Sequence, residues 1–325
     1  MVLSKIIIAS YVLQMFIVLM QYLKFESFYL NDVENLGLNT GMTQNSSGGI
    51  RYWGSFGEAL VLSTYLTSIG IGVSVYMISV FKKNIVTYIL ILTIIFTIYL
   101  TGSRAGLSIY IIMICVYLFL SKVSSLFMII GLILFVLIGS QFSILSFIGA
   151  SENLSRFAQL QGNDARYVLW TKGFNIIYNN PIFGSSIGCL NYSLKEHNLL
   201  PGFVSTINAS GHVENSFLTI LFSVGIAGFL FFLGLVFYPL TLIRRYHLMT
   251  LSDMSLYKAI TKAYTYSYIS LLLCMFTEPS VGVHMRSSMV FIIMNALVCC
   301  LAKIYVIDND MLNSKSSIKS LIVSS

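Results

Sequence analysis

Charged residues are scarce in this chain. Asp, Glu, Lys and Arg make up 10% of its 325 residues, whereas an ordinary soluble domain carries about 25%. Hydrophobic residues make up 57%, and apolar runs close to the roughly 20 residues that cross a bilayer recur from end to end. The composition argues against a soluble domain and predicts a multi-span α-helical membrane protein.

Acidic residues and cysteines are few as well. The formal net charge is +7, but the basic residues cluster at the ends of apolar runs, which does not favour a nucleic-acid partner. Four of the five cysteines fall within apolar runs and Cys189 stands alone, so no intramolecular disulfide is implied. No group of His, Cys, Asp and Glu has the spacing of a metal site, so no metal is expected.

About eight spans are predicted, which gives an all-α polytopic membrane fold. They cover Ile6–Leu23, Ala59–Val80, Ile85–Leu100, Leu107–Leu120, Leu126–Ile148, Asn215–Tyr238, Ala263–Phe276 and Ser288–Val306. The first is too long for a signal peptide and lacks a clear cleavage site, so it is expected to be retained. Residues 1–308 are interpreted as one bundle that includes a long loop, 149–213, and the tail 309–325 is expected to be disordered.

Basic residues in the short loops predict the orientation. Lys82, Lys83 and Lys122 fall on the same side as the loop from Arg244 to Lys262, and basic loops face the cytoplasm. Both termini and the tail are therefore expected to be cytoplasmic. The long loop is expected on the outer side.

The predicted outer side collects arginines. Arg51, Arg104, Arg166 and Arg286 oppose the orientation rule or lie at span ends, where a charge is costly. Because guanidinium forms bidentate bonds to phosphate oxygens, the set suggests an anionic ligand. Each arginine could instead contact lipid headgroups, or form a salt bridge to a carboxylate such as Glu214.

The long loop contains a predicted amphipathic helix, Asp164–Asn179. Tyr167, Trp170, Phe174 and Ile177 recur at helical spacing on one face, and Asn180-Pro181 is expected to end the helix. Tyr167 and Trp170 could stack on a sugar or an isoprenoid, or they could pack against the protein. The helix is expected to lie against the bundle or in the membrane interface.

Further candidates lie near the end of the loop. The backbone N–H of Gly184 could meet a phosphate, or its Pro–Gly stretch could form a turn. Glu214 could accept a proton, or it could be a carboxylate placed favourably at a helix start. His212 competes for the same role, because imidazole titrates near neutral pH. Asn215 is interpreted as a helix cap, with substrate contact as the alternative.

Several motifs follow one another in order. They are Arg51-x-x-Gly54-x-Phe56, Thr101-Gly102-Ser103-Arg104-Ala105-Gly106, Arg166-x-x-x-Trp170, Asn180-Pro181-x-Phe183-Gly184-x-x-x-Gly188, Glu214-Asn215-Ser216-x-Leu218 and Gly225-Ile226-x-Gly228. This ordered set, spread over roughly half of the chain, resembles the O-antigen polymerase and ligase superfamily.

The resemblance implies a GT-C-like glycosyltransferase in the bacterial cytoplasmic membrane. It implies a donor and an acceptor linked to undecaprenyl diphosphate, reaction at the outer face, and no metal, cofactor or sugar nucleotide. Membrane lipids and a chain-length regulator are candidate partners. We therefore predict catalytic roles for Glu214, His212, Arg166 and Arg104, and substrate contacts for Arg51, Arg286, Trp170, Tyr167, Asn215 and Gly184.

The alternatives differ in what is transferred. Ligases usually have His where this chain has Glu214, so the resemblance favours a polymerase of repeat units over an O-antigen-ligase-type transferase. A flippase or transporter of lipid-linked saccharide is a third possibility. Transporters often contain inverted repeats, whereas no repeat is visible here and the charges lie at the predicted outer mouth.

Overall fold

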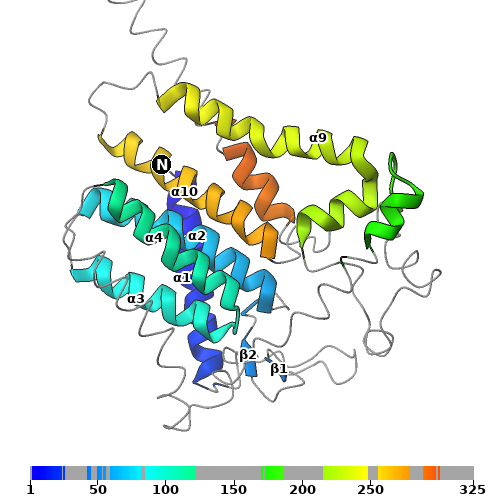
Figure 1. The fold of residues 1–325 in the computed structure, drawn as a ribbon. Coiled ribbons are helices and arrows are strands. Elements are labelled where there is room, and N and C mark those ends of the chain that lie inside the picture. The colour runs from blue at the N-terminus through cyan, green and yellow to red at the C-terminus, as the bar shows by residue number, and fades with distance from the viewer. Residues whose placement is uncertain are drawn as a thin grey trace, which may run out of the picture.

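The structure is a computed structural model, and it describes residues 2–23, 25, 42–44, 50–52, 54–55, 59–81, 85–121, 170, 173–185, 215–247, 255–277, 288–297 and 299–300. Six long helices make up most of this part: α1 (Val2–Tyr22), α2 (Ala59–Phe81), α3 (Ile85–Leu100), α4 (Arg104–Leu120), α9 (Ser216–His247) and α10 (Ser255–Thr277). A shorter helix covers Ser288–Leu297, and residues 173–179 are also helical. Figure 1 shows the arrangement.

The first four predicted spans are confirmed as the helices α1 to α4. The fourth and seventh are longer than predicted, because α4 begins at Arg104 and α10 begins at Ser255. The basic loop predicted between spans six and seven is correspondingly shorter: Arg244 and Arg245 lie inside α9, and Lys258 and Lys262 lie inside α10. The predicted fifth span and the predicted tail lie outside the described residues.

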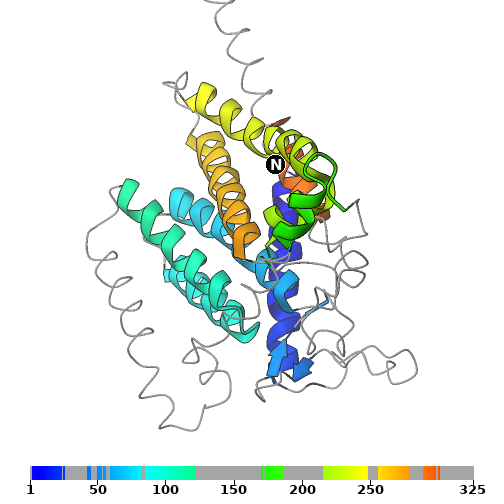
Figure 2. The same ribbon diagram turned by 45° about the vertical axis from the view of Figure 1, so that its right-hand side comes forward.

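A small hairpin is the exception to the predicted all-α class. The strands β1 (Met42–Gln44) and β2 (Ile50–Tyr52) are antiparallel, with Thr43 opposite Arg51. The buried side-chain amide of Gln21 holds the segment after β2, because it donates to the Gly54 carbonyl and accepts from the Gly54 N–H, both at 3.0 Å. The hairpin therefore lies beside the end of α1 (Figures 1 and 2).

Helix α2 forms the centre of the bundle. It packs against α10, α4, α3 and α1, and 89% of its apolar stretch is buried, compared with 17% for α9. Small residues allow the close approach that membrane helices use in place of a hydrophobic driving force. A Cβ atom added to Gly72 would lie 3.0 Å from Ser267 Cβ, and Ser267 Oγ donates to the Ser68 carbonyl at 2.5 Å.

Length and composition set which helices can cross a membrane. Among the described residues, α2 and the stretch Ser216–Arg244 are long and apolar enough. Four further helical stretches are apolar but shorter: Ile6–Tyr22, Ile85–Leu100, Arg104–Leu120 and Ser288–Leu297. These helices are consistent with a membrane protein of several spans.

Helix α9 is two helices joined at Gly225. Gly225 has a φ of 68° and a ψ of −172°, which no helix allows. The rings of Phe217 and Phe232 lie 5.9 Å apart, whereas 15 residues of straight helix would separate them by about 22 Å. The chain therefore folds back into a short arm (residues 216–224) and a long arm (residues 226–247), and Figure 1 shows the sharp change of direction at the right-hand end.

This reversal corrects the predicted continuous span Asn215–Tyr238. Hydropathy treats the two arms as one apolar run, because the apolar residues continue through Gly225. The long arm has 22 residues, and Arg244, Arg245 and His247 lie at its end. Its apolar part, residues 226–243, would extend about 27 Å, which nearly matches a hydrocarbon core of about 30 Å. The short arm is not needed for the crossing.

The turn at residues 180–185 is bonded to the reversal. The Ile226 N–H donates to the Pro181 carbonyl at 2.8 Å, and the Ser185 N–H donates to the Phe222 carbonyl at 2.9 Å. In a continuous helix, Ile226 N–H and Phe222 C=O would bond to each other. The turn thus takes the place of one helical hydrogen bond. The N–H of Ile226 and the carbonyl of Phe222 each bond to the turn instead of to each other.

Two glycines make this approach possible. Gly184 has a φ of 64°, and a Cβ there would lie 2.5 Å from the Phe222 carbonyl oxygen. A Cβ on Gly225 would overlap the Ile182 carbonyl. Any side chain at either position would push the two backbones apart.

We predict that Gly225→Ala lowers the thermal unfolding midpoint of the purified protein by roughly 2–8 °C. A non-glycine residue at this combination of φ and ψ costs about 1–3 kcal/mol, and the shift follows from the usual dependence of Tm on stability in a chain of this size. The overlap with Ile182 would add to the loss. Gly234→Ala is the matched control in the same helix, since nothing lies within 4 Å of its added Cβ. Equal midpoints for the two variants would contradict the hinge.

Candidate functional site

Several helix ends meet at one end of the bundle. The start of α2, the turn between α3 and α4, the end of α10 and the start of α9 lie toward the lower right in Figure 1, with the β1–β2 hairpin nearby. Five of the ten predicted site residues lie in the described part: Arg51, Arg104, Trp170, Gly184 and Asn215. Arg166, Tyr167, His212, Glu214 and Arg286 lie outside the described residues, so their roles remain predictions.

Arg104 is the first residue of α4, and the motif before it builds the turn. Gly102 has a φ of 68°, and the Thr101 hydroxyl donates to the Ile98 carbonyl at 2.7 Å. Ser103 caps α4, since its Oγ accepts from the Gly106 N–H at 3.0 Å. The small residues thus satisfy the backbone, and the Arg104 side chain is exposed at the positive end of a helix.

Gly106, the last residue of that motif, sets the contact between α4 and α2. A Cβ at this position would overlap Ser63 Oγ and lie 2.9 Å from Thr67 Oγ1. Ser63 and Thr67 are fully buried, and neither hydroxyl has a hydrogen-bond partner among the residues that the structure describes. The start of α4, which carries Arg104, therefore packs directly against the central helix α2.

Asn215 uses both ends of its side-chain amide. Its Oδ1 accepts from the Leu218 N–H at 3.0 Å, which confirms the predicted helix cap. Its Nδ2 donates to the Phe276 carbonyl at 2.9 Å, near the end of α10. The stacked rings of Phe217 and Phe276, with centroids 4.3 Å apart, strengthen the same junction. Asn215 thus fixes the short arm to α10, directly after Glu214 in the sequence.

Trp170 and Gly184 lie at the other end of the short arm. Trp170 is half-buried and packs with Ile176 against Phe222, as its packing interpretation predicted. The Gly184 N–H donates to the Asn180 carbonyl at 2.9 Å, so it forms the predicted turn. The helix ends at residue 179, as predicted. Gly173 and Ile176 are buried in it. Phe174 is half-exposed, but its ring meets the Phe222 ring edge-on with the centroids 5.3 Å apart, as its predicted packing face requires.

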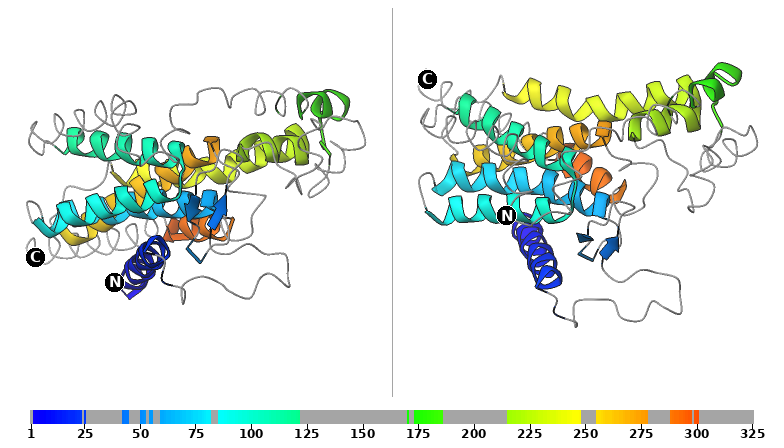
Figure 3. Two further views of the ribbon diagram at one scale, coloured as in Figure 1. Left: turned by 90° about the horizontal axis from the view of Figure 1, so that it is seen from below. Right: turned by 60° about the horizontal axis from the view of Figure 1, so that its bottom comes forward.

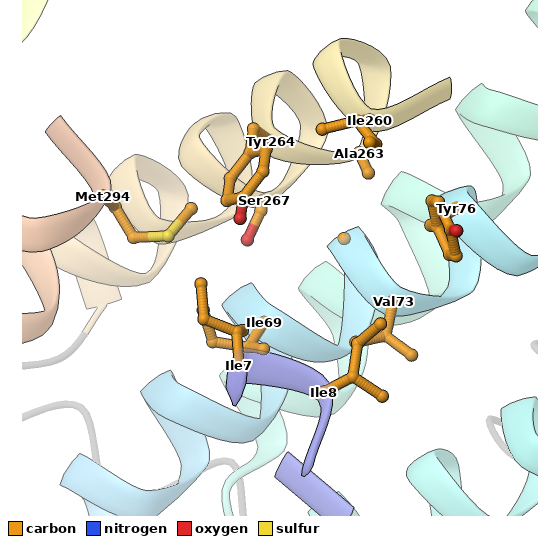
Figure 4. A pocket seen from close by; sticks show the side chains of 11 residues that line it. Ile7, Ile8, Ile69, Val73, Tyr76, Ile260, Ala263, Tyr264, Ser267 and Met294 are labelled. Carbon is orange, nitrogen blue, oxygen red and sulfur yellow. The ribbon is translucent and has the colours of Figure 1, made fainter. Parts of the chain in front are cut away.

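A cavity of about 50 Å³ lies elsewhere, between α1, α2, α10 and Ser288–Leu297. Figure 4 shows aliphatic and aromatic side chains around it, with the Ser267 hydroxyl as one of its few polar groups. Ligand pockets usually measure about 300–1,000 Å³, and none of the predicted site residues lines this cavity. Within the described ranges, no three His, Cys, Asp or Glu side chains come together to hold a metal ion.

Residues 89–233 match the family model described as O-antigen ligase. The matched stretch is a little under half of the chain and includes α4, the turn at 180–185 and the hinge of α9. Over this stretch the chain is similar to the O-antigen polymerase and ligase superfamily, which supports the resemblance found in the sequence. The members of this family are enzymes that transfer glycans. No curated protein matches the chain.

Two structural devices were missed by sequence reasoning. Gln14 and Gln21, seven residues apart in an apolar helix, hold the segment at Ser55 and Gly54. The sequence signal for these bonds was the pair of glutamines on one face of an otherwise apolar helix. The hinge was missed because Gly225 was interpreted only as part of a motif within a continuous helix.

We predict that Asn215→Ala destabilises the protein more than Asn215→Ser. Serine can still cap the helix but cannot reach Phe276, whereas alanine loses both bonds. The expected losses are roughly 0.5–1.5 kcal/mol for serine, with about 1 kcal/mol more for alanine. Thermal unfolding midpoints of the purified variants measure the order. Wild-type midpoints in both variants would show that the junction contributes nothing to stability.

Proposed function

We propose that this protein joins oligosaccharide repeat units carried on undecaprenyl diphosphate, as an O-antigen or capsule-type polymerase. The observation that carries the proposal is the O-antigen ligase match over residues 89–233, a family that implies lipid-linked glycan substrates. Glutamate at position 214, where ligases usually have histidine, favours polymerisation. The reaction would take place at the outer face of a bacterial cytoplasmic membrane, with both termini and the tail 309–325 inside.

The proposed reaction is a substitution at a sugar carbon. A hydroxyl oxygen of the acceptor unit bonds to C1 of the donor sugar, and the bond from C1 to the diphosphate oxygen breaks. The electron pair leaves with undecaprenyl diphosphate, and the hydroxyl proton passes to a base. The protein must therefore stabilise a leaving diphosphate and accept one proton.

Arg104 is proposed to bind the diphosphate together with Arg166, with Arg51 and Arg286 as further phosphate contacts. Two features of Arg104 support this role. Its side chain is exposed, and it is the first residue of a 17-residue helix. The charge of the guanidinium and the helix dipole both attract an anion, and the guanidinium supplies bidentate bonds.

Glu214 is proposed to accept the proton of the acceptor hydroxyl, with His212 as the competing base. Its neighbour in the sequence, Asn215, is bonded to the end of α10, and a well-fixed neighbour suits a group that must meet a substrate at a set position. Tyr167 is proposed to stack on sugar or isoprenoid, and so is the exposed part of Trp170, whose other part packs on Phe222. A chain-length regulator is a proposed partner, and residues 1–308 are proposed to form one bundle.

The ligase alternative uses the same donor and the same leaving group. It differs in the acceptor, which would be a lipid A-core or another finished carrier rather than a second repeat unit. The flippase alternative lacks the bond-making step altogether. Surface glycans of a deletion strain separate the three, because each loss leaves a different product.

We predict that a deletion strain displays single-unit glycans at its surface. Loss of a ligase would instead leave long glycans on their lipid carrier, and loss of a flippase would trap lipid-linked units inside the cell. Gel profiles of surface and lipid-linked polysaccharide distinguish these results. Complementation with Glu214→Gln should also leave mainly single units, since a general base contributes about 10²–10⁴ in rate.

His212→Ala is the companion variant. If it abolishes polymerisation while Glu214→Gln does not, the base is His212. Wild-type chain lengths with both variants, at normal protein levels, would remove both residues from the chemistry. Long glycans in the deletion strain would contradict the polymerase itself.

We predict that Arg104→Lys slows polymerisation by roughly 10²–10³, which is the effect of removing one preorganised charge-stabilising donor. Lysine keeps the charge and the helix end but lacks the planar fork that binds two phosphate oxygens. The measurement is the rate of chain growth at matched protein levels. Arg244→Lys is the control, since Arg244 is exposed near the far end of α9. Equal rates for the two variants would return Arg104 to a structural role.

A further inference from the structure

An apolar edge stands out on residues 173–185. Phe174, Tyr178, Ile182 and Phe183 are 50%, 87%, 58% and 77% exposed. They follow one another along a single short helix and the turn after it. Large apolar side chains rarely form a continuous surface exposed to water, so such an edge usually marks a site that contacts a protein or a membrane.

The short helix has three distinct faces. Gly173 and Ile176 are buried against Phe222. Counted from Gly173 at 100° per residue, Phe174 and Tyr178 fall at about 100° and 140° around the helix, and Asn175 and Asn179, both exposed, fall at about 200° and 240°. Tyr178 thus points away from the buried face, whereas the half-exposed Phe174 also meets the Phe222 ring edge-on. The exposed surface of this short helix therefore has an aromatic side and an amide side, as in a helix lying at a boundary between lipid and water.

The edge is held in place by the bundle. The bonds from Ile226 to Pro181 and from Ser185 to Phe222 fix the turn to the hinge of α9, and Gly173 lies against the Phe222 ring. In Figure 3 this segment lies at the same end of α9 in both views. Because backbone bonds on both sides of Ile182 hold the turn, the edge cannot turn inward to bury its side chains.

The edge is continuous with a surface that faces lipid. Ile226, which is bonded to the turn, is exposed, and so are Leu230 and Phe231 one turn further along the long arm. Only 17% of the apolar stretch of α9 is buried, so its exposed apolar side suits contact with the hydrocarbon core of a membrane. The aromatic edge begins where this lipid-facing surface ends.

We propose that Phe174, Tyr178, Ile182 and Phe183 insert into the interfacial layer of the membrane beside the hinge of α9, with Asn175 and Asn179 facing water. Aromatic side chains are enriched at this depth because a ring can lie in the acyl region while a polar group such as the tyrosine hydroxyl reaches headgroups and water. The edge would hold residues 173–185, and the hinge bonded to them, at a fixed height relative to the bilayer. The inference concerns membrane docking and does not depend on the reaction proposed above.

The test compares the two sides of one helix in the full-length protein. Single cysteines are introduced as Tyr178→Cys, Phe183→Cys, Asn175→Cys and Asn179→Cys in a background without the five native cysteines, and each is labelled with a nitroxide. The protein is reconstituted in vesicles of phosphatidylethanolamine and phosphatidylglycerol. Collision with molecular oxygen reports lipid exposure, and collision with a water-soluble nickel chelate reports exposure to water.

We expect the ratio of oxygen to nickel collisions to be several-fold higher at 178 and 183 than at 175 and 179. Equal ratios at the four positions would overturn the proposal, because the edge would then lie in water. Low collision rates with both probes at 178 and 183 would also overturn it, since the edge would then be covered by protein.

Phe183→Trp and Asn179→Trp provide a second readout that needs no label. In vesicles of lipid brominated near the headgroup end of its acyl chains, Phe183→Trp should add a strongly quenched emission component, whereas Asn179→Trp should add an unquenched one. Equal quenching of the two added tryptophans would contradict the insertion.

Discussion

One exchanged backbone hydrogen bond determines the shape of the matched region. Ile226 N–H and Phe222 C=O would pair in a straight helix, and here they pair with Pro181 and Ser185. Both groups of this opened bond keep a partner, so neither is left unsatisfied in an apolar setting, where it would cost several kcal/mol. Two motifs about forty residues apart in the sequence thus form the two halves of one joint.

The same requirement explains a second irregularity in α9. Pro239 lies inside the long arm and has no N–H to give to the Leu235 carbonyl four residues earlier. The Asn295 side-chain amide, from the helix Ser288–Leu297, donates to that carbonyl at 3.2 Å. One residue along, the Val236 carbonyl accepts from the Tyr268 hydroxyl at 2.9 Å. The break in the ladder of α9 therefore also fixes where α9 contacts its two neighbours.

The sequence predicted the helices α1 to α4 well, because each is a single apolar run bounded by polar or charged residues. It could not predict the reversal of α9, since apolar residues continue through Gly225 and hydropathy carries no information on φ. Asn215 was correctly predicted as a cap from its position alone, but its bond to Phe276 joins residues 61 apart and has no local signal. For Arg104, the sequence identified the motif, and the structure supplied the helix start and the exposed side chain.

The joint between the turn and α9 has a consequence for the 29 residues from 186 to 214. Ser185 is bonded to Phe222, and Asn215 begins the same helix arm, about 10 Å away along its axis. Both ends of this stretch are thus held at one place by the flanking backbone. Insertions, deletions and exchanges here, where His212 and Glu214 lie, are therefore expected to leave the bundle intact, so that the chain could change what it recognises without changing how it folds.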